Sequence, residues 1–384
     1  MHEALHQSAM LLRAFLRKHL AALFTEHPEP PLASLPQPIN TSALLTRSSW
    51  LNTQQHIHNH LGSKQQFFTP CELFPHHLAS LLLRTLVPPS EHIIEVGAGT
   101  GAVASHASSS ISWSSIELSH QLASMQRSNI SGLHSLAVGD CMTNVPWQSI
   151  ASQLPADCNH LTIVCNELLD NLPHDAVEWH GRSHSWQQVE IDDESNKEVL
   201  TPLRDTLIAD TLDAFNASRP SRLHRAFTGL TALRRRRIYL PTGLHSMLQS
   251  ARDALCNDSR FVSFFALDFA HVPDSKLPGV FAPAVATQRG YGQTTEHSGF
   301  LSLRQYGDAD IIFPSDLHNL IPELCTRTLG TEPMPRIACS LSELYRHHGD
   351  VSSTAAADGF HPLLHDFHNY SVVLCQSRQN EAET

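Results

Sequence analysis

The sequence predicts an α/β fold, a doubly wound seven-stranded sheet that carries an inserted cap region. Apolar runs of strand length alternate with helical segments between residues 75 and 173, which is typical of a parallel sheet covered on both faces. The run Ile93–Val96 breaks directly into the glycine turn Gly97-Ala98-Gly99-Thr100-Gly101-Ala102. A turn of this kind between a buried strand and a helix lets backbone N–H groups approach a ligand closely, because no Cβ stands in the way.

The individual elements follow from periodicity and from helix breakers. A helix begins near Pro75 and ends in the segment 84–89, because Leu78, Leu81 and Leu82 form one apolar face before two prolines. Strands are expected over 93–96, 113–118, 136–140 and 161–165, with helices over 103–110 and 120–129 between them. The last of these strands is an unbroken apolar run, as expected where both faces of a sheet are buried. Segments 261–268, 311–313 and 370–375 are expected to complete the sheet.

Four regions are expected along the chain. Residues 1–45 form an N-terminal helix or presequence with a Pro-rich linker, 46–173 the half of the core that bears the glycine turn, 174–260 an inserted cap or substrate region, and 261–384 the other half of the core sheet. The N-terminus carries leucines at helical spacing beside Arg13 and Arg17 and has few acids. This pattern is typical of a mitochondrial presequence, and an ordinary first helix fits it equally well.

Composition restricts the class of protein. The formal charge of -11, from 26 basic and 37 acidic residues, disfavours nonspecific binding to nucleic acid, which needs clustered cations. No apolar run reaches the roughly 18 residues that cross a bilayer, so no membrane span is expected. The 8 cysteines form no C-x-x-C pair, which favours reduced thiols in an intracellular compartment. The run His56–His60 has no accompanying cysteine or carboxylate ligands, so no metal site is expected.

Acidic residues stand at the ends of the predicted strands. Glu117 ends the second strand and Asp140 the third, and Glu95 precedes the glycine turn. The carboxyl ends of parallel strands meet at one edge of the sheet, where ligands bind. Glu117 is expected to accept hydrogen bonds from ribose hydroxyls, and Asp140 either binds an adenine amino group or simply belongs to a turn. These side chains predict a pocket for an adenosine-containing cofactor.

Two cofactors fit the glycine turn. The run Gly97-Ala98-Gly99-Thr100-Gly101-Ala102 satisfies the G-x-G-x-x-G/A dinucleotide pattern, with an acid about 20 residues on. Glu95, Gly97, Gly99 and Gly101 equally satisfy the E-x-G-x-G-x-G pattern of S-adenosylmethionine (SAM) methyltransferases. A plain structural turn is the remaining alternative for the glycines.

The fourth strand runs directly into Asn166-Glu167-Leu168-Leu169-Asp170-Asn171-Leu172-Pro173. Two carboxylates and an amide beyond a buried strand need either solvent or a cationic partner, because an unpaired buried charge is costly. Alternatively, the acids mark the start of a helix, where the helix dipole favours negative charge.

This segment resembles the N-E-x-x-D-x-L-P signature of the mitochondrial complex I assembly arginine methyltransferases and their bacterial MidA-like relatives. Weaker similarities occur in the same order over about residues 60 to 376, at Phe67–Glu72, Ile116–Ser119 with Leu122 and Gln126, Ala266–Ala270 and Gly307–Ile311. The chain departs from the family at Ala98, where a proline is usual, and at Asp268-Phe269-Ala270, which lacks the tyrosine and glycine of I-D-Y-G. These departures concern the substrate more than the cofactor.

The resemblance implies a SAM-dependent protein arginine methyltransferase that acts on a mitochondrial protein such as a respiratory complex I subunit, and it favours SAM over a nicotinamide cofactor. Glu167 and Asp170 are the candidates for holding the guanidinium group, which stays protonated at any working pH, and for accepting its proton. Asn166 would orient the nitrogen or the methionine end of SAM. Two further hypotheses remain: an assembly factor of this fold with little or no turnover, and a methyltransferase for small molecules or RNA.

Overall fold

The computed structural model describes residues 70–86, 91–107, 111–192, 197–218, 237–256, 260–272, 275–288, 294–297, 310–333, 338–349, 360–365 and 367–377. The N-terminal helix or presequence, the Pro-rich linker, the His56–His60 run and the motif residues 67–69 and 307–309 lie outside these ranges. None of the helices within them is long and apolar enough to cross a membrane.

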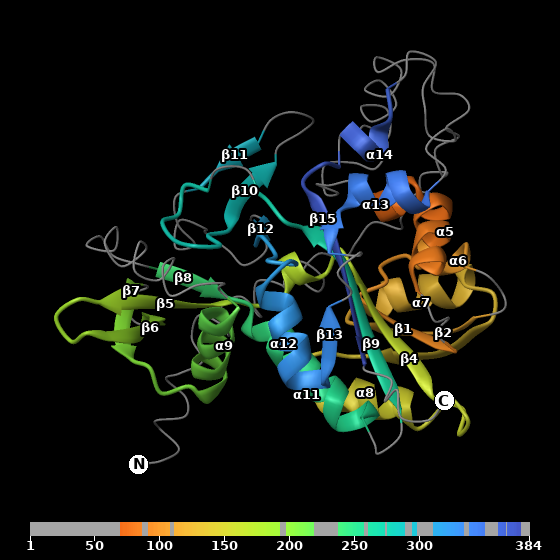
Figure 1. Cartoon of the computed structure of the whole chain (residues 1–384), viewed down its shortest axis with the longest axis horizontal. Coiled ribbons are helices and arrows are strands. Elements are labelled where there is room, and N and C mark those ends of the chain that lie inside the picture. The colour runs from red at the N-terminus through yellow and green to blue at the C-terminus, as the bar shows by residue number, and fades with distance from the viewer. Residues whose placement is uncertain are drawn as a thin grey trace.

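Seven strands form the main sheet, in the order β3-β2-β1-β4-β9-β15-β13 (Figure 1). Their bounds are β1 His92–Val96, β2 Ser112–Glu117, β3 Leu133–Val138, β4 His160–Asn166, β9 Phe261–Phe269, β13 Thr331–Pro333 and β15 Tyr370–Ser377. Strands β1 to β4 and β9 are parallel, whereas β15 is antiparallel to both β9 and β13. A two-residue strand, β14 (Cys339–Ser340), adds to β15. The predicted α/β class with a seven-stranded sheet is confirmed.

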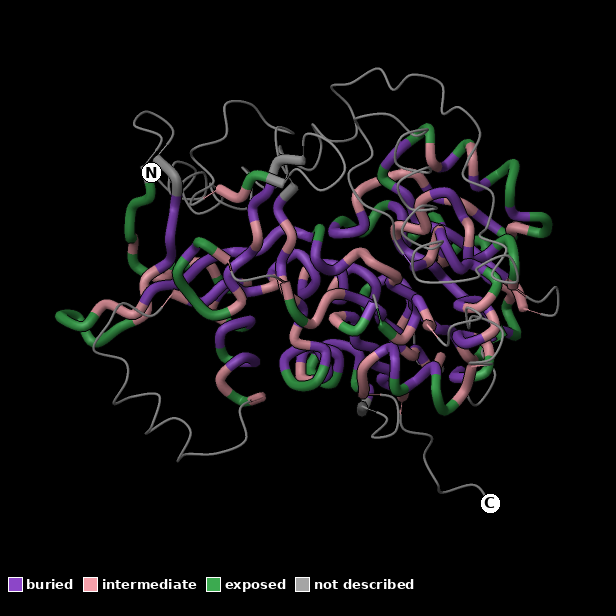
Figure 2. The backbone as a smooth tube through the Cα atoms, turned by 90° about the horizontal axis from the view of Figure 1, so that it is seen from above, coloured by how far each residue is buried: buried purple, intermediate pink, exposed green. Residues whose placement is uncertain are grey.

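Helices cover both faces of this sheet. One apolar core receives side chains from α8 (Asn144–Ala151), α11 (Thr242–Leu255) and α12 (Leu320–Leu329). The other core receives side chains from α4 (Pro70–Leu73), α5 (Pro75–Thr85), α6 (Ala102–Ser105) and α13 (Leu341–His348). Helix α7 (His120–Asn129) packs on β2 and β3, and α14 (Pro362–His365) packs on α13. Buried backbone therefore runs through the middle of the molecule (Figure 2), and all five residues of β1 are buried. Burial on both faces explains the predominantly apolar run Leu161–Cys165 within β4.

A second sheet, antiparallel throughout, lies between β4 and β9 in the sequence. Its strands are β5 (Asp175–His180), β6 (Ser185–Asp192), β7 (Lys197–Pro202) and β8 (Arg237–Leu240), in the order β7-β6-β5-β8. Trp179 and Trp186 face each other across β5 and β6, with ring centroids 5.5 Å apart. Arg237 forms ion pairs with Glu178 at 3.2 Å and Glu198 at 2.7 Å. Aromatic and ionic cross-strand pairs thus stabilise this sheet.

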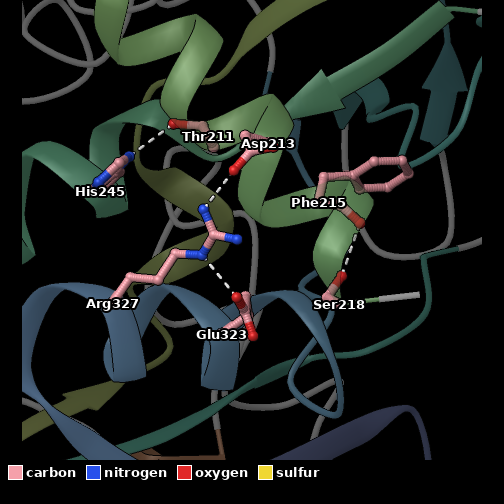
Figure 3. A network of polar contacts seen from close by, with 7 residues as sticks. All are labelled: Thr211, Asp213, Phe215, Ser218, His245, Glu323 and Arg327. Carbon is pink, nitrogen blue, oxygen red and sulfur yellow. Dashed lines mark hydrogen bonds and ion pairs between the residues drawn. The ribbon is translucent and has the colours of Figure 1, made fainter. Parts of the chain in front are cut away.

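Helix α9 (Thr206–Ala217) ties this part of the chain to the core helices, as Figure 3 shows. Thr211 Oγ1 lies 2.8 Å from His245 Nδ1 on α11 in a buried hydrogen bond. Arg327 on α12 binds Asp213 of α9 at 2.7 Å and Glu323 of its own helix at 2.6 Å. The ion pairs are exposed and contribute at most about 1 kcal/mol each, so the buried contact and apolar packing hold α9 in place.

One expected strand of the main sheet is misplaced in the sequence-based prediction. The run 311–313 overlaps β12 (Asp310–Ile312), which pairs with β10 (Ala284–Gln288) in a three-stranded sheet with β11 (Thr294–Glu296). The seventh position of the main sheet belongs instead to β13, a three-residue strand that follows the left-handed Gly330 at the end of α12. A short apolar run has the same pattern in either sheet, so only its hydrogen-bonding partner decides which sheet it joins.

Candidate functional site

The three glycines of the turn after β1 have positive φ angles of 68°, 56° and 75° at Gly97, Gly99 and Gly101. A Cβ at Gly97 would lie 2.8 Å from Leu168 Cδ1, and one at Gly101 2.7 Å from Ile130 Cδ1, so these two glycines face neighbouring side chains that would have to shift. A Cβ at Gly99 would meet nothing within 4 Å. Gly99 is therefore the glycine at which the backbone lies open to a ligand.

Helix α7 and the end of β2 hold the turn in place. Gln126 Nε2 donates to the carbonyl oxygen of Gly99 at 2.8 Å, and Asn129 Nδ2 donates to that of Thr100 at 3.0 Å. The carboxylate of Glu117 accepts from Gly99 N at 3.2 Å through Oε2 and from Ser119 N at 3.0 Å through Oε1. These contacts engage both the N–H and the carbonyl group of Gly99 and hold it beside the Glu117 carboxylate, so what is open at Gly99 is the space beside its Cα.

A cavity of about 270 Å³ opens at the carboxyl ends of the strands, close to the lower end of the ~300–1,000 Å³ range of small-molecule sites. It is lined by Val96, Gly97, Gly99, Ile116, Glu117, Leu118, Leu122, Gly139, Asp140, Cys141, Met142, Glu167, Leu168, Asn171 and Leu172. Of the sequence-predicted site residues, Gly97, Gly99, Glu117, Asp140 and Glu167 line this cavity. The glycine turn and the N-E-x-x-D segment thus meet at one cavity, although they are about 70 residues apart.

The other predicted residues, Glu95, Gly101, Asn166 and Asp170, are not among the lining residues. Asn166 Nδ2 donates to Glu95 Oε1 at 2.9 Å, so these two side chains join the ends of β4 and β1. Side chains alternate along a strand, and Glu95 therefore faces the side of the sheet opposite to Val96. Burial raises the pKa of Glu95 to about 7.

Glu167 takes an unusual backbone conformation, a left-handed φ of 55°, immediately after β4. Left-handed non-glycine residues cost on the order of 1–3 kcal/mol and concentrate at functional sites. The Glu167 carboxyl group accepts from Cys71 N through Oε1 and from the Tyr370 hydroxyl through Oε2, each at 3.1 Å. Burial, reinforced by the negative charges of Glu72 and Asp268, raises the pKa of Glu167 to about 8.

Asp268, at the end of β9, holds the segment that follows Glu167. Its Oδ2 accepts from Leu169 N at 2.6 Å and from Asp170 N at 3.4 Å, and its Oδ1 accepts from Phe269 N at 2.7 Å. This carboxyl group, on a fully buried residue, anchors the short helix η2 (Leu169–Asn171). The sequence showed Asp268 only as part of an altered motif, and nothing in that motif indicated which backbone groups it binds.

Asp170 is nearly buried, at 4% exposure, and its Oδ1 accepts from Asn171 Nδ2 at 2.7 Å. Burial and the neighbouring Asp268 and Glu167 carboxyls raise its pKa. The ion pairs formed by the described residues involve other carboxylates (Glu178, Glu198, Asp213, Asp253, Glu296 and Glu323). An acidic site without a protein cation in the described part of the chain favours a ligand that brings positive charge.

The raised pKa values make the stability of the ligand-free protein depend on pH. Burial raises the pKa of Asp268 and Glu95 to about 7 and that of Glu167 to about 8, so the folded state retains protons that the unfolded chain has released. Burial lowers the pKa values of His92 and His174 to about 4. These two histidines change the free energy of unfolding only below pH 6.5, where they make it rise with pH instead of fall.

We therefore expect the free energy of unfolding to fall as pH rises from 6.5 to 8, by on the order of 1 kcal/mol per pH unit for each of these carboxyls that is still protonated in the folded state, and to level off above their folded-state pKa values. Urea denaturation at several pH values measures this slope. In the variant Glu167→Gln the fall should be smaller, and a stability that is constant or rising over this window would contradict the prediction.

Comparisons with known proteins agree with the class of site. A family model described as "Putative S-adenosyl-L-methionine-dependent methyltransferase" matches residues 79–331, more than half of the chain. No curated protein matches significantly.

Solved structures of similar overall length also match. An uncharacterized protein from Burkholderia thailandensis is 15% identical, covering 95% of this chain and 93% of its own, with a TM-score of 0.47. A second protein from the same organism, bound to S-adenosyl-homocysteine, is 14% identical over 95% of this chain and 93% of its own, with a TM-score of 0.49. The CcbJ methyltransferase from Streptomyces caelestis is 9% identical over 85% and 96% of the two chains, with a TM-score of 0.35.

Proposed function

We propose that this chain, which belongs to the family of SAM-dependent methyltransferases whose model it matches, methylates a guanidinium nitrogen of an arginine side chain in a protein. SAM is the methyl donor of the family. The observation that carries the arginine proposal is the cavity itself, because Gly99 and Glu117 line the same space as Glu167. This arrangement supports a proposed cofactor site that adjoins an acidic group for a cationic substrate.

The residues present fit the cofactor. The open space over Gly99 admits a ligand where a Cβ would otherwise project, and the Glu117 carboxylate beside it is placed for ribose hydroxyls. Asp140, whose Oδ1 accepts from Met142 N at 2.9 Å, is the proposed partner of the adenine amino group. Gly97 and Gly101 allow the turn to pack on Leu168 and Ile130. Glu95, which precedes the turn, is proposed to support the site indirectly, through its hydrogen bond with Asn166. When bound, SAM supplies an electrophilic methyl group.

On the substrate side, Glu167 is proposed to bind the guanidinium group and to accept its proton as the nitrogen becomes alkylated. A buried carboxyl with a pKa near 8 is a stronger base than an ordinary glutamate, and an incoming cation restores its negative charge. Asp170 belongs to the same group of buried acids, and an incoming cation would favour its ionised form as well. Asn166 is proposed to position the strand end through Glu95. Catalysis here consists mainly of holding the nitrogen in line with the methyl carbon.

The finer proposal rests on the sequence resemblance: the substrate is a mitochondrial protein, such as a respiratory complex I subunit, and the protein acts in mitochondria. The region 174–260, which contains the β5–β8 sheet, is proposed to bind the protein around the target arginine. Cross-linking of arginine-containing substrate peptides followed by mass spectrometry tests the contact with this region.

One observation favours a second candidate, a binding protein with little turnover. Both oxygens of Glu167 already accept hydrogen bonds from the protein, and the Leu168 side chain packs on Gly97 within the cavity wall. Calorimetric titration with SAM, followed by transfer of a radiolabelled methyl group to arginine-containing peptides, separates the two. Binding with transfer to arginine supports the enzyme, binding without any transfer supports the scaffold, and absence of binding contradicts the cofactor assignment.

A further inference from the structure

Two donors from opposite ends of the described chain hold the Glu167 carboxyl group. Cys71 on α4 is 96 positions before it and Tyr370 on β15 is 203 positions after it. We propose that the Tyr370 hydroxyl is a positioning group, which orients the Glu167 carboxylate and stabilises its anionic form for a cationic substrate. This inference rests on the function proposed above, because it assigns Tyr370 a role only through Glu167.

The hydrogen bonds to Glu167 can fix the orientation of its carboxylate. The Cys71 amide donates to Oε1 and the Tyr370 hydroxyl to Oε2, both at 3.1 Å, and the Cys71 thiol forms a further hydrogen bond with this carboxyl group. Two donors on two oxygens fix the plane of the carboxylate. A carboxylate has about four acceptor positions, so capacity remains on both oxygens for the N–H groups of a guanidinium ion.

The Tyr370 ring is itself held rigidly. It is 3% exposed, lies 4.3 Å from the Phe269 ring between centroids, and meets Phe367 edge-on at 5.8 Å. Tyr370 is the first residue of β15 and pairs in register with Phe269 of β9. The sheet therefore aims the hydroxyl at Glu167, and loss of the hydroxyl alone leaves this packing in place.

The electrostatic surroundings make this donor important. The titratable side chains around Glu167 are Cys71 and Glu72 from α4, Asp170 from η2, Asp268 from β9 and Tyr370 from β15. Burial and the nearby carboxyls raise the pKa of Tyr370 well above its ordinary value of 10, so its hydroxyl stays protonated and can only donate to a carboxylate. At Glu167 itself, the Cys71 amide and the Tyr370 hydroxyl are neutral donors that oppose the repulsion from the neighbouring acids.

The test is Tyr370→Phe, which keeps the ring and removes the donor. The probe is N-acetyl-L-arginine amide, titrated by NMR into protein saturated with S-adenosylhomocysteine between pH 5.5 and 9.5, with N-acetyl-L-citrulline amide as the uncharged control. Wild-type binding should increase with pH as Glu167 ionises. In Tyr370→Phe the midpoint should move upward by about one pH unit, with roughly tenfold weaker binding at pH 7 that recovers at high pH, because a hydrogen bond to a charged group is lost.

A matched variant is Tyr345→Phe, which removes a buried hydroxyl from α13 and should leave the midpoint unchanged. In the Glu167→Gln background, Tyr370→Phe should cause no further loss of binding. An unshifted midpoint in Tyr370→Phe, with wild-type protein binding arginine in a pH-dependent way, overturns the positioning role and leaves the proposed function intact. If wild-type protein binds arginine no better than citrulline at any pH, the arginine proposal itself is wrong.

Discussion

Replacing Glu167 by glutamine is expected to stop methyl transfer while leaving SAM affinity within a few-fold of the wild-type value. The amide keeps the size of the side chain but cannot accept a proton, and it removes the negative charge that a guanidinium group would bind. General-base contributions alone are about 10²–10⁴-fold, so the loss of product formation should reach at least about 100-fold. Single-turnover assays with radiolabelled SAM and arginine-containing peptides, together with calorimetric titration of SAM, measure the two quantities separately.

Glu190→Gln is the matched control for this variant. Glu190 is also buried, at 7% exposure, but it lies on β6, where its Oε1 accepts from Gln188 and Thr201, and it is not a lining residue of the cavity. Because Glu190 lies in the proposed peptide-binding region 174–260, the two variants are compared with the small acceptor N-acetyl-L-arginine amide, to which the control should retain full transfer activity even if its stability falls. A fully active Glu167→Gln variant would remove Glu167 from the mechanism.

The second large effect is expected at Gly99, where valine should reduce SAM affinity by at least about 100-fold. The branched side chain would project into the open space next to the Glu117 carboxylate, where the cofactor is proposed to lie. Its left-handed φ of 56° adds a conformational cost on the order of 1–2 kcal/mol, which lowers stability as well. Calorimetry at a temperature where the variant remains folded measures the affinity.

Gly132→Val separates the steric effect on SAM binding from the conformational cost of valine at a positive φ. Gly132 has a φ of 86° and, like Gly99, no heavy atom within 4 Å of an added Cβ, but it lies in the turn between α7 and β3 rather than at the cavity. The Gly132→Val protein should therefore be destabilised to a similar extent as Gly99→Val and should bind SAM with wild-type affinity. SAM binding by Gly99→Val with unchanged affinity would refute the assignment of the turn to the cofactor.

The sequence predicts the first half of the main sheet closely. The expected helix over 120–129 coincides with α7, and the expected strands over 93–96 and 161–165 lie within β1 and β4. These elements depend on local signals: apolar runs of strand length, the Ser119 cap that accepts from Leu122 N, and the glycine turn. Where the signal is only three residues long, as at β12 and β13, the prediction is wrong about which strand completes the sheet.

In the candidate site, too, some residues can be found from the sequence, whereas the contacts of others are visible only in the structure. Gly99, Glu117, Asp140 and Glu167 can be singled out from the sequence because each stands at or just after the end of a predicted strand, and parallel strands end at one edge. Their role in binding and catalysis stays a prediction until the variants are measured. Asp268 shows the limit of motif reading, because its altered neighbours hide a carboxylate that anchors three backbone N–H groups.

By itself the sequence determined the α/β class, the glycine turn after β1 and the order in which acidic residues reach one edge of the sheet. These features depend on spacing over a few residues, where periodicity and backbone preference act. Only the tertiary structure decided that Cys71 and Tyr370 donate to Glu167 and that Glu95 turns away from the cavity to Asn166. Such contacts join residues 71 to 203 positions apart, and packing of the completed sheet, rather than any local pattern, brings them within hydrogen-bonding distance.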